Sequence, residues 1–115
     1  YKKPQFDVVA SFAALHHLPT LSLQLKVLKE MRRVLKKNGV LVLTVWNLWQ
    51  PKYKQYIEAK TQHSYIPWGN PPRTERFYYA FKKAELKKLL TQAGFSKVKF
   101  IPSKHNFFVT CYEKS

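Results

Sequence analysis

The chain has 115 residues, which is enough for one hydrophobic core and too few for two. Apolar residues make up 45% of it and aromatic residues 16%, a composition that excludes a disordered or fibrous chain. Lysine and arginine number 21 against 6 acidic residues, so the net charge of +15 predicts attraction to polyanions, nucleic acid first and an anionic membrane surface second.

The first elements of the chain are predicted to be a strand, a helix and a second strand. Residues 6–11 form a short apolar run with β-branched residues, typical of a buried strand. Apolar residues recur at helical spacing over 22–37, and Asn38 and Gly39 follow as a left-handed stop. Residues 40–46 are again apolar and β-branched. Short connections between these elements predict a βαβ unit with parallel strands and a right-handed crossover.

Residues 47–76 contain no long periodic run and several prolines, which predicts a long excursion with a short helix over 53–60. Its many aromatic residues argue against disorder because they need a surface to pack on. A second amphipathic helix is predicted over 83–93, and Gly94 ends it. Strands over 98–101 and 107–112 then close the chain, and the turn between them is too short for a crossover helix. We therefore expect an α/β fold with an antiparallel final strand.

Two features are candidates for a functional site. His16 and His17 follow the first strand, and ligands of open α/β sheets lie at the carboxyl ends of strands. The alternative is that both histidines only pack the strand end. In the excursion, lysines and arginines interleave with tyrosine and tryptophan, a pattern typical of proteins that hold unpaired nucleotides, although packing beneath a long loop explains it as well.

Other kinds of site are not expected. Cys111 is the single cysteine, which excludes an intrachain disulfide and a cysteine-rich zinc site and favours a cytoplasmic protein. The remaining histidines are distant in sequence, so no metal site is predicted. No apolar run approaches the roughly 18 residues of a membrane span, and no signal peptide opens the chain, so no membrane partner is expected.

In this order, the elements resemble the C-terminal half of a class I S-adenosylmethionine-dependent methyltransferase. Residues 6–18, FDVVASFAALHHL, are similar to the fourth strand of that family and its cofactor-side loop. Residues 28–40, LKEMRRVLKKNGV, are similar to the following helix and its turn into the fifth strand. The resemblance implies half of a Rossmann-like sheet and S-adenosyl-L-methionine as cofactor. The residues it assigns to the cofactor are Ser11, Phe12, Ala13 and His16.

The rest of the chain is similar to the tRNA methyltransferases that esterify 5-carboxymethyluridine at the wobble position. The resemblance lies in residues 66–68, IPW, in 76–86, RFYYAFKKAEL, in 106–109, NFFV, and in the histidine pair. It implies a tRNA partner, makes residues 47–76 an insertion on the substrate side, and leaves room for a small activator subunit. The residues expected to bind the substrate are Trp46, Trp68, Arg73, Tyr78 and Tyr79.

The chemistry of that reaction suits the residues present. A carboxylate acceptor is ionised at neutral pH, so methyl transfer to it needs no strong general base. It needs alignment and a cation that positions the acid, which Arg76 or Arg73 would supply. A nitrogen or phenol acceptor would need a base, and His17 is the best candidate. The predicted catalytic residues are therefore His17 and Arg76.

The first half of the family pattern has no counterpart here, neither its glycine-rich motif nor the acidic residue that holds the ribose. The chain does not begin with Met, and we expect residues 1–115 to be one partial methyltransferase domain that alone binds the cofactor weakly or not at all. The missing neighbour of the first strand would leave an apolar edge. The alternatives are a small-molecule methyltransferase, a non-catalytic basic module that binds RNA or partners a methyltransferase subunit, and a basic surface that only keeps the chain soluble.

Overall fold

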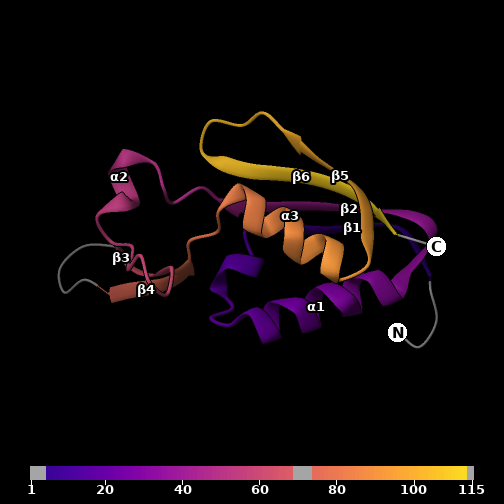
Figure 1. Ribbon diagram of the computed structural model, residues 1–115, viewed down its shortest axis with the longest axis horizontal. Helices are drawn as coiled ribbons and strands as arrows, with labels where there is room; N and C mark the ends of the chain where they lie inside the picture. Colours follow the sequence, from indigo (N-terminus) through magenta and orange to yellow (C-terminus); the bar gives the residue numbers. More distant parts are fainter. Residues whose placement is uncertain (1–4, 69–73, 114–115) are drawn as a thin grey trace.

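The computed structural model describes residues 5–68 and 74–113 of the chain. Strands and helices alternate in its first part, and a small hairpin interrupts the order before the last helix and strands (Figure 1). The elements are β1 (Phe6–Phe12), η1 (Leu15–His17), α1 (Leu21–Val34), β2 (Leu35–Trp46), α2 (Pro51–Lys54), β3 (His63–Trp68), β4 (Thr74–Tyr79), α3 (Lys83–Gln92), β5 (Phe95–Ile101) and β6 (Asn106–Glu113).

Four strands form the main sheet in the order β1-β2-β6-β5. β1 and β2 are parallel, which confirms the predicted βαβ unit, and β6 runs antiparallel to both β2 and β5. The register pairs Phe12 with Thr44 in β2, and it pairs Trp46 at the end of β2 with Asn106 at the start of β6. The carboxyl ends of β1 and β2 and the beginning of β6 therefore meet at one end of the sheet. The predicted α/β class with antiparallel final strands is confirmed.

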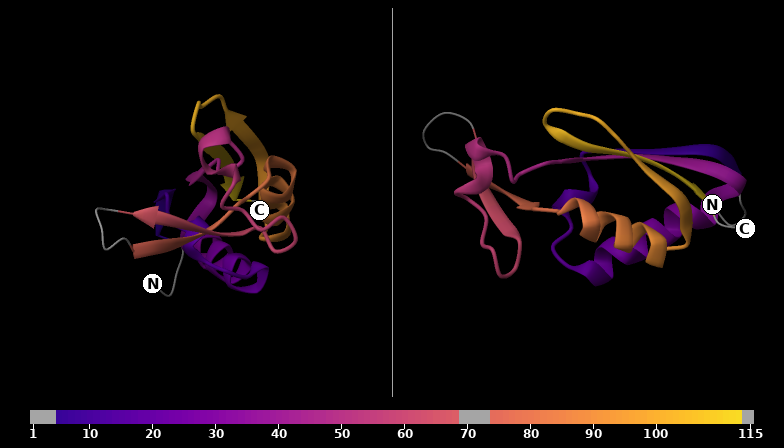
Figure 2. Two further views of the ribbon diagram at one scale, coloured as in Figure 1. Left: turned by 90° about the vertical axis from the view of Figure 1, so that its left-hand side faces the viewer. Right: turned by 45° about the horizontal axis from the view of Figure 1, so that its top comes forward.

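Helices α1 and α3 cover one face of this sheet and contact each other (Figures 1 and 2). Apolar side chains from both helices and from all four strands of the sheet meet between these layers. The core is built mainly from leucine and phenylalanine, whose burial from water stabilises the folded state. Side chains of this core with no measurable exposure are Leu28, Leu41, Leu43, Val45, Phe81, Leu86, Leu90, Val109 and Cys111.

The opposite face of β1 is open. Val8 is 57% exposed and Phe12 is 63% exposed, although Val9 and Ser11 on the other face are half-buried and buried. β1 is also an edge of the four-stranded sheet, so one side of its backbone has no neighbouring strand among the described residues. An apolar face on an edge strand is a surface that proteins normally cover.

The helix predicted over 22–37 is wrong at its end, because α1 stops at Val34. Leu35 is extended and buried, and it pairs with Phe6 before the pairing shifts to Val8 with Val40. Asn38 has a φ of +64°, which is the left-handed conformation that the sequence predicts, but it lies inside the irregular start of β2. A Cβ on Gly39 would lie 2.8 Å from the carbonyl oxygen of Lys36, so the close approach there requires glycine.

The prediction for residues 47–76 is also wrong in part. The helix is shorter and earlier than 53–60, at α2, and a two-stranded antiparallel hairpin of β3 and β4 follows it. Ser64 and Ile66 are buried and Tyr65 between them is exposed, which is the alternation of a strand. Pro67 fits because β3 and β4 form a two-stranded sheet, and the isolated bridge from Ile57 to β3 is at Ser64 rather than at Pro67. The hairpin projects beyond the sheet at the end where β2 finishes (Figures 1 and 2).

The last part of the chain follows the prediction with longer strands. α3 ends next to Gly94, whose φ is +100° as expected of a left-handed helix stop. β5 begins at Phe95 and β6 at Asn106, so each strand is longer than the predicted 98–101 and 107–112. Among the described residues, no helix has the length and apolar character needed to cross a membrane.

Leu28 and Leu23 lie on the same helix, and substitutions at these two positions test how much the packing of α1 contributes to the free energy of unfolding. Leu28 has no exposed surface and Leu23 is 44% exposed. We expect Leu28→Ala to lower the free energy of unfolding by about 2–5 kcal/mol, because it leaves a cavity in the core. Leu23→Ala should change it by less than about 0.5 kcal/mol. Urea denaturation followed by circular dichroism measures both, and equal effects would contradict this account of the core.

Candidate active site at the strand ends

Four side chains that the sequence analysis singles out come together at the carboxyl ends of β1 and β2. His16 and His17 lie in η1, Trp46 ends β2, and Tyr78 comes from β4. The ring centroid of Tyr78 is 5.0 Å from those of both His16 and Trp46, and 4.9 Å from that of His17. We call these four residues the aromatic cluster. It joins the parallel strands to the hairpin.

His16 is a buried and neutral member of the aromatic cluster. It is 1% exposed, and its Nδ1 accepts a hydrogen bond from the backbone N–H of Trp46 at 3.1 Å. Burial, assisted by the neighbouring His17, lowers the pKa of His16 from 6.5 to about 4. A neutral ring with an accepting Nδ1 carries its proton on Nε2. His16 therefore fixes the end of β2 against η1 rather than serving as a base.

His17 differs from its neighbour because its side chain is exposed. Its Nδ1 is 3.2 Å from the carbonyl oxygen of Phe77, which can only accept a hydrogen bond. Nδ1 therefore donates to Phe77, and Nε2 of the neutral ring is left as the accepting nitrogen. Of the two adjacent histidines, His17 is thus the exposed one, whose Nε2 can accept a hydrogen bond from a bound molecule.

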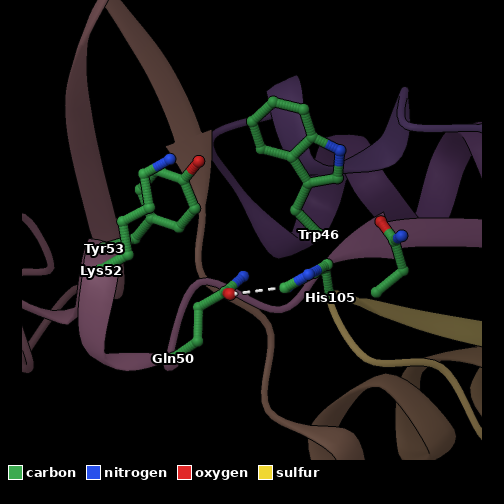
Figure 3. Close-up of a pocket in the computed structure, with 6 residues that line it drawn as sticks. Trp46, Gln50, Lys52, Tyr53 and His105 are labelled. Carbon is green, nitrogen blue, oxygen red and sulfur yellow. Dashed lines mark hydrogen bonds between the residues drawn. The ribbon is translucent and has the colours of Figure 1, made fainter.

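The ring of Trp46 lies nearly parallel to the rings of two tyrosines. On Tyr78 its ring lies at 5.0 Å with an angle of 16° between the planes, and towards Tyr53 the separation is 6.3 Å with an angle of 21°. A pocket of about 280 Å³ opens beside Trp46 and Tyr53 (Figure 3). The remaining residues that line this pocket are Gln50, Lys52, His105 and Asn106.

The residues assigned to the cofactor lie where β1 ends. Ser11 is 5% exposed, and its hydroxyl has no hydrogen-bond partner among the described residues. The N–H of Ala13 donates to both the carbonyl oxygen and the Oγ1 of Thr44, and Ala13 has a φ of +52°. Such a backbone conformation is costly for alanine and is commonest at functional sites. An unpaired buried hydroxyl beside a strained turn suits a ligand that binds at this strand end.

The other predicted residues are not all brought to the aromatic cluster. Arg76 is exposed and lies two positions from Tyr78, on the same face of β4. Tyr79 points to the core instead, and its hydroxyl donates to Glu85 at 3.2 Å; burial and Glu85 raise its pKa to about 12. Trp68 ends β3 but its side chain is not described, and Arg73 lies outside the described residues.

The sequence analysis missed part of the pocket. Gln50 and His105 belong to none of the motifs described above, and Asn106 belongs to the NFFV segment but is not among the predicted site residues. Gln50 and His105 are 55 positions apart in the sequence, although Nδ1 of His105 lies 3.0 Å from Oε1 of Gln50. Only the pairing of β2 with β6 brings Asn106 opposite Trp46. That register could have been inferred had the two strands been aligned with each other. Within the described residues, no group of three or more potential ligands could hold a metal ion.

The low pKa of His16 predicts that the free energy of unfolding depends on pH. Because the pKa in the folded chain, about 4, is below the ordinary 6.5, the unfolded chain takes up the proton first as the pH falls. The stability that neutral His16 contributes is complete above pH 6.5 and is lost between pH 6.5 and 4, by roughly 3 kcal/mol. His16→Gln, which keeps an acceptor but does not titrate, should show a smaller loss over this range in urea unfolding. His105→Gln, at an exposed position, is the control and should keep the whole loss.

The chain is similar to proteins of a known family. The family model described as "Methyltransferase domain" matches residues 1–99. A protein of Encephalitozoon cuniculi that carries a methyltransferase assignment is 34% identical over 93 residues, which are 78% of this chain and 44% of that protein. The tRNA (carboxymethyluridine(34)-5-O)-methyltransferase of Schizosaccharomyces pombe is 28% identical over 127 residues, with 91% of this chain and 56% of that protein covered.

Solved structures agree on the fold. The crystal structure of a SAM-dependent methyltransferase from Methanosarcina mazei superposes with a TM-score of 0.77 at 22% identity, covering 99% of this chain and 62% of the other. The chain spans about half the length of the curated relatives it matches. The family match extends over most of the sequence and includes the strand ends at which the aromatic cluster lies. The chain belongs to the methyltransferase domain family.

Proposed function

We propose that the protein containing this chain transfers a methyl group from S-adenosyl-L-methionine to RNA, and that the acceptor is the carboxymethyl group of a tRNA wobble uridine. The observation that carries the proposal is the aromatic cluster, which stands beside the end of β1 and opens onto a pocket lined by Lys52 and Tyr53. Stacking rings together with positive charge are what an unpaired nucleotide requires. The name of the Schizosaccharomyces pombe relative supports the same acceptor.

The cofactor would supply the methyl group as a sulfonium. Ser11, Phe12 and Ala13 would hold it at the end of β1, where a buried hydroxyl lacks a partner among the described residues and a ring is exposed. His16 would act indirectly, because it is buried and bound to the backbone of Trp46. Glycine occurs only three times in the sequence, and no glycine-rich loop is present. This chain would therefore form one wall of the cofactor site, and the other wall would come from elsewhere in the protein.

Residues of the hairpin would position the acceptor. A carboxylate needs a cation rather than a base, and Arg76 lies on the face of β4 that also carries Tyr78. The bidentate guanidinium of Arg76 would align the acid with the methyl group. His17 would become the general base only if the acceptor were a nitrogen or a phenol, since its Nε2 is the accepting nitrogen.

Transfer of labelled methyl groups tests this function in the protein as it is made in the cell. Incubation with bulk tRNA that carries 5-carboxymethyluridine should label the tRNA, and mild alkali should release the label because the product is an ester. Alkali-stable label would move the acceptor to a nitrogen, carbon or ether oxygen. Label that enters a metabolite extract but not tRNA would favour a small-molecule methyltransferase. Binding of tRNA without any transfer would leave a non-catalytic RNA-binding module.

Substitutions at Arg76 and His17 distinguish a carboxylate acceptor from an acceptor that needs a base. We expect Arg76→Ala to lower kcat/KM by about 10- to 100-fold, the value of a charge-assisted hydrogen bond to the acceptor, and Arg76→Lys to lose less. His17→Gln should leave kcat within a few-fold of the wild type, since a carboxylate needs no base. Steady-state kinetics of tRNA methylation measure both. A large loss of kcat in His17→Gln, together with unchanged kinetics in Arg76→Ala, would show that the reaction needs the base and not the cation.

We also propose that the open face of β1 is covered by the remainder of the methyltransferase fold, with residues 1–115 forming one partial domain. The exposed Val8 and Phe12 and the edge position of β1 support this, as does the greater length of the relatives. A neighbouring strand would extend the sheet, and helices would cover the apolar face. Such an arrangement would also supply the second wall of the cofactor site.

The substitution Val8→Thr tests whether the open face of β1 is covered in the whole protein. In the 115-residue chain, Val8→Thr should change the free energy of unfolding by less than about 0.5 kcal/mol, because the side chain is exposed. In the whole protein the same change should cost about 1–3 kcal/mol, because a buried hydroxyl would lack a partner. Val109→Thr, at a fully buried position of β6, should be costly in both and serves as the control. Equal, small effects of Val8→Thr in both proteins would show that the face stays open.

A further inference from the structure

Four hollows lie in succession from the pocket beside Trp46 towards the far end of β5, and each shares residues with the next. The pocket beside Trp46 shares Asn106 with a second hollow beneath the turn between β5 and β6. That hollow shares Lys83 and Phe100 with a third one between α3 and β5, which in turn shares Lys87 and Val98 with a fourth. We call this path the lysine groove.

The lining of the lysine groove is strongly basic. Five lysines contribute to its walls, and no aspartate or glutamate of the described chain does. The salt bridges between described residues use Arg32 and Arg33, so none of these lysines is neutralised in that way. Several ammonium groups lie over aromatic rings, as Nζ of Lys83 does at 5.0 Å from the ring of Phe100. The five lysines are Lys52, Lys83, Lys87, Lys97 and Lys99.

Two aromatic rings lie at one end of the lysine groove and border an opening that we call the slot. Trp46 and Tyr53 lie in nearly parallel planes, at 21°, with centroids 6.3 Å apart, and the two rings are beside each other rather than face to face (Figure 3). A base laid on either ring needs one contact distance of about 3.5 Å, and the pocket of about 280 Å³ opens beside both rings. Gln50 and His105 are hydrogen-bonded to each other at the side of this slot (Figure 3). Their amide and imidazole groups offer donors and acceptors to the edge of a base.

We propose that the lysine groove binds a single strand of RNA. One base stacks on the rings of Trp46 and Tyr53, and the phosphates of the adjoining nucleotides lie against the lysines of α3 and β5. Because Trp46 also stacks on Tyr78 of the aromatic cluster, the base in the slot belongs to a nucleotide next to the methyl acceptor. The proposal rests on RNA being the substrate, but it makes a separate claim about which surface holds the strand.

Charge complementarity favours this occupant. Phosphates of a flexible strand can follow a narrow path of cations from one hollow to the next, whereas the headgroups of a membrane form a broad surface. Aromatic stacking at one end and cations along the rest is also the usual combination in proteins that bind single strands. Phosphates alone, as in a membrane surface, would make no use of the aromatic rings at the slot.

The first experiment removes two cations from the lysine groove. Binding of a fluorescent tRNA anticodon-loop oligonucleotide to the protein as it is made in the cell is measured by anisotropy at several salt concentrations, with no methyl donor present. We expect Lys83→Ala/Lys87→Ala to weaken binding and to reduce the slope of log K against log salt by about 1.4, or about 0.7 for each phosphate that is no longer neutralised. The matched control is Lys26→Ala/Lys29→Ala on the exposed side of α1, which should keep the slope.

The second experiment tests the slot. Tyr53→Ala should weaken binding of the same oligonucleotide by about 5- to 150-fold with an unchanged salt slope, since this change removes stacking and leaves the charge as it was. Tyr53→Phe keeps the ring and should bind as the wild type does. Tyr56→Ala is the matched control, because Tyr56 is a neighbouring exposed tyrosine that does not line the pocket. Circular dichroism of each variant shows whether it is folded.

These results are independent of methyl transfer. An unchanged slope in Lys83→Ala/Lys87→Ala, or a slope that changes equally in the α1 control, would overturn the proposal even if tRNA is methylated. Binding to anionic lipid vesicles that disappears in the double variant, with RNA binding intact, would make the lysine groove a membrane surface instead. The expected slopes without any methylation would keep the lysine groove as an RNA site and remove the proposed function.

Discussion

The hydrogen bond from the backbone N–H of Trp46 to Nδ1 of His16 is the contact on which the rest of the site depends. It ties the end of β2 to the turn that follows β1, and burial keeps the ring neutral so that Nδ1 can accept. The side chain of Trp46 is then held in place for Tyr78 to stack on it, which also anchors the hairpin. His17, one residue further on, is exposed because His16 takes the buried position. The two adjacent histidines thus have different surroundings: His16 is buried in the contact between β2 and η1, and His17 is exposed.

The antiparallel partner of β2 extends this site in a second direction. Trp46 pairs with Asn106, so the beginning of β6 and the turn before it lie beside the same ring. His105 reaches Gln50 across this junction. Trp46 therefore contacts the aromatic cluster at the carboxyl ends of β1 and β2 through Tyr78, and it lines a separate pocket together with Tyr53. A substrate held on both sides of Trp46 would be oriented by the sheet, because β2 pairs with a strand on each side.

The sequence was sufficient for the parts of the fold that depend on local pattern. The βαβ unit was predictable because two apolar, β-branched runs flank a helical period, and the position of His16 and His17 followed from it. The hairpin was not, because Pro67 and the prolines after it resemble a loop, and the alternation of Ser64, Tyr65 and Ile66 is short. The end of α1 was missed because Lys36 and Lys37 suit the last turn of a helix. The pocket was missed because it depends on the register between β2 and β6, which joins residues with no shared motif.

The few acidic residues explain why one surface stays strongly basic. Glu30 and Glu113 form ion pairs with arginines of α1, and Glu85 accepts hydrogen bonds from Tyr79 and Gln62. Half of the six acidic residues are thus engaged in contacts between or within elements. The lysines of α3 and β5 meet no acidic side chain of the described residues along the groove between them, so their charges add to one field instead of cancelling. Five of the 21 lysines and arginines line the path that ends at the rings of Trp46 and Tyr53, and an uninterrupted series of cations without acidic neighbours is what a chain of phosphates requires.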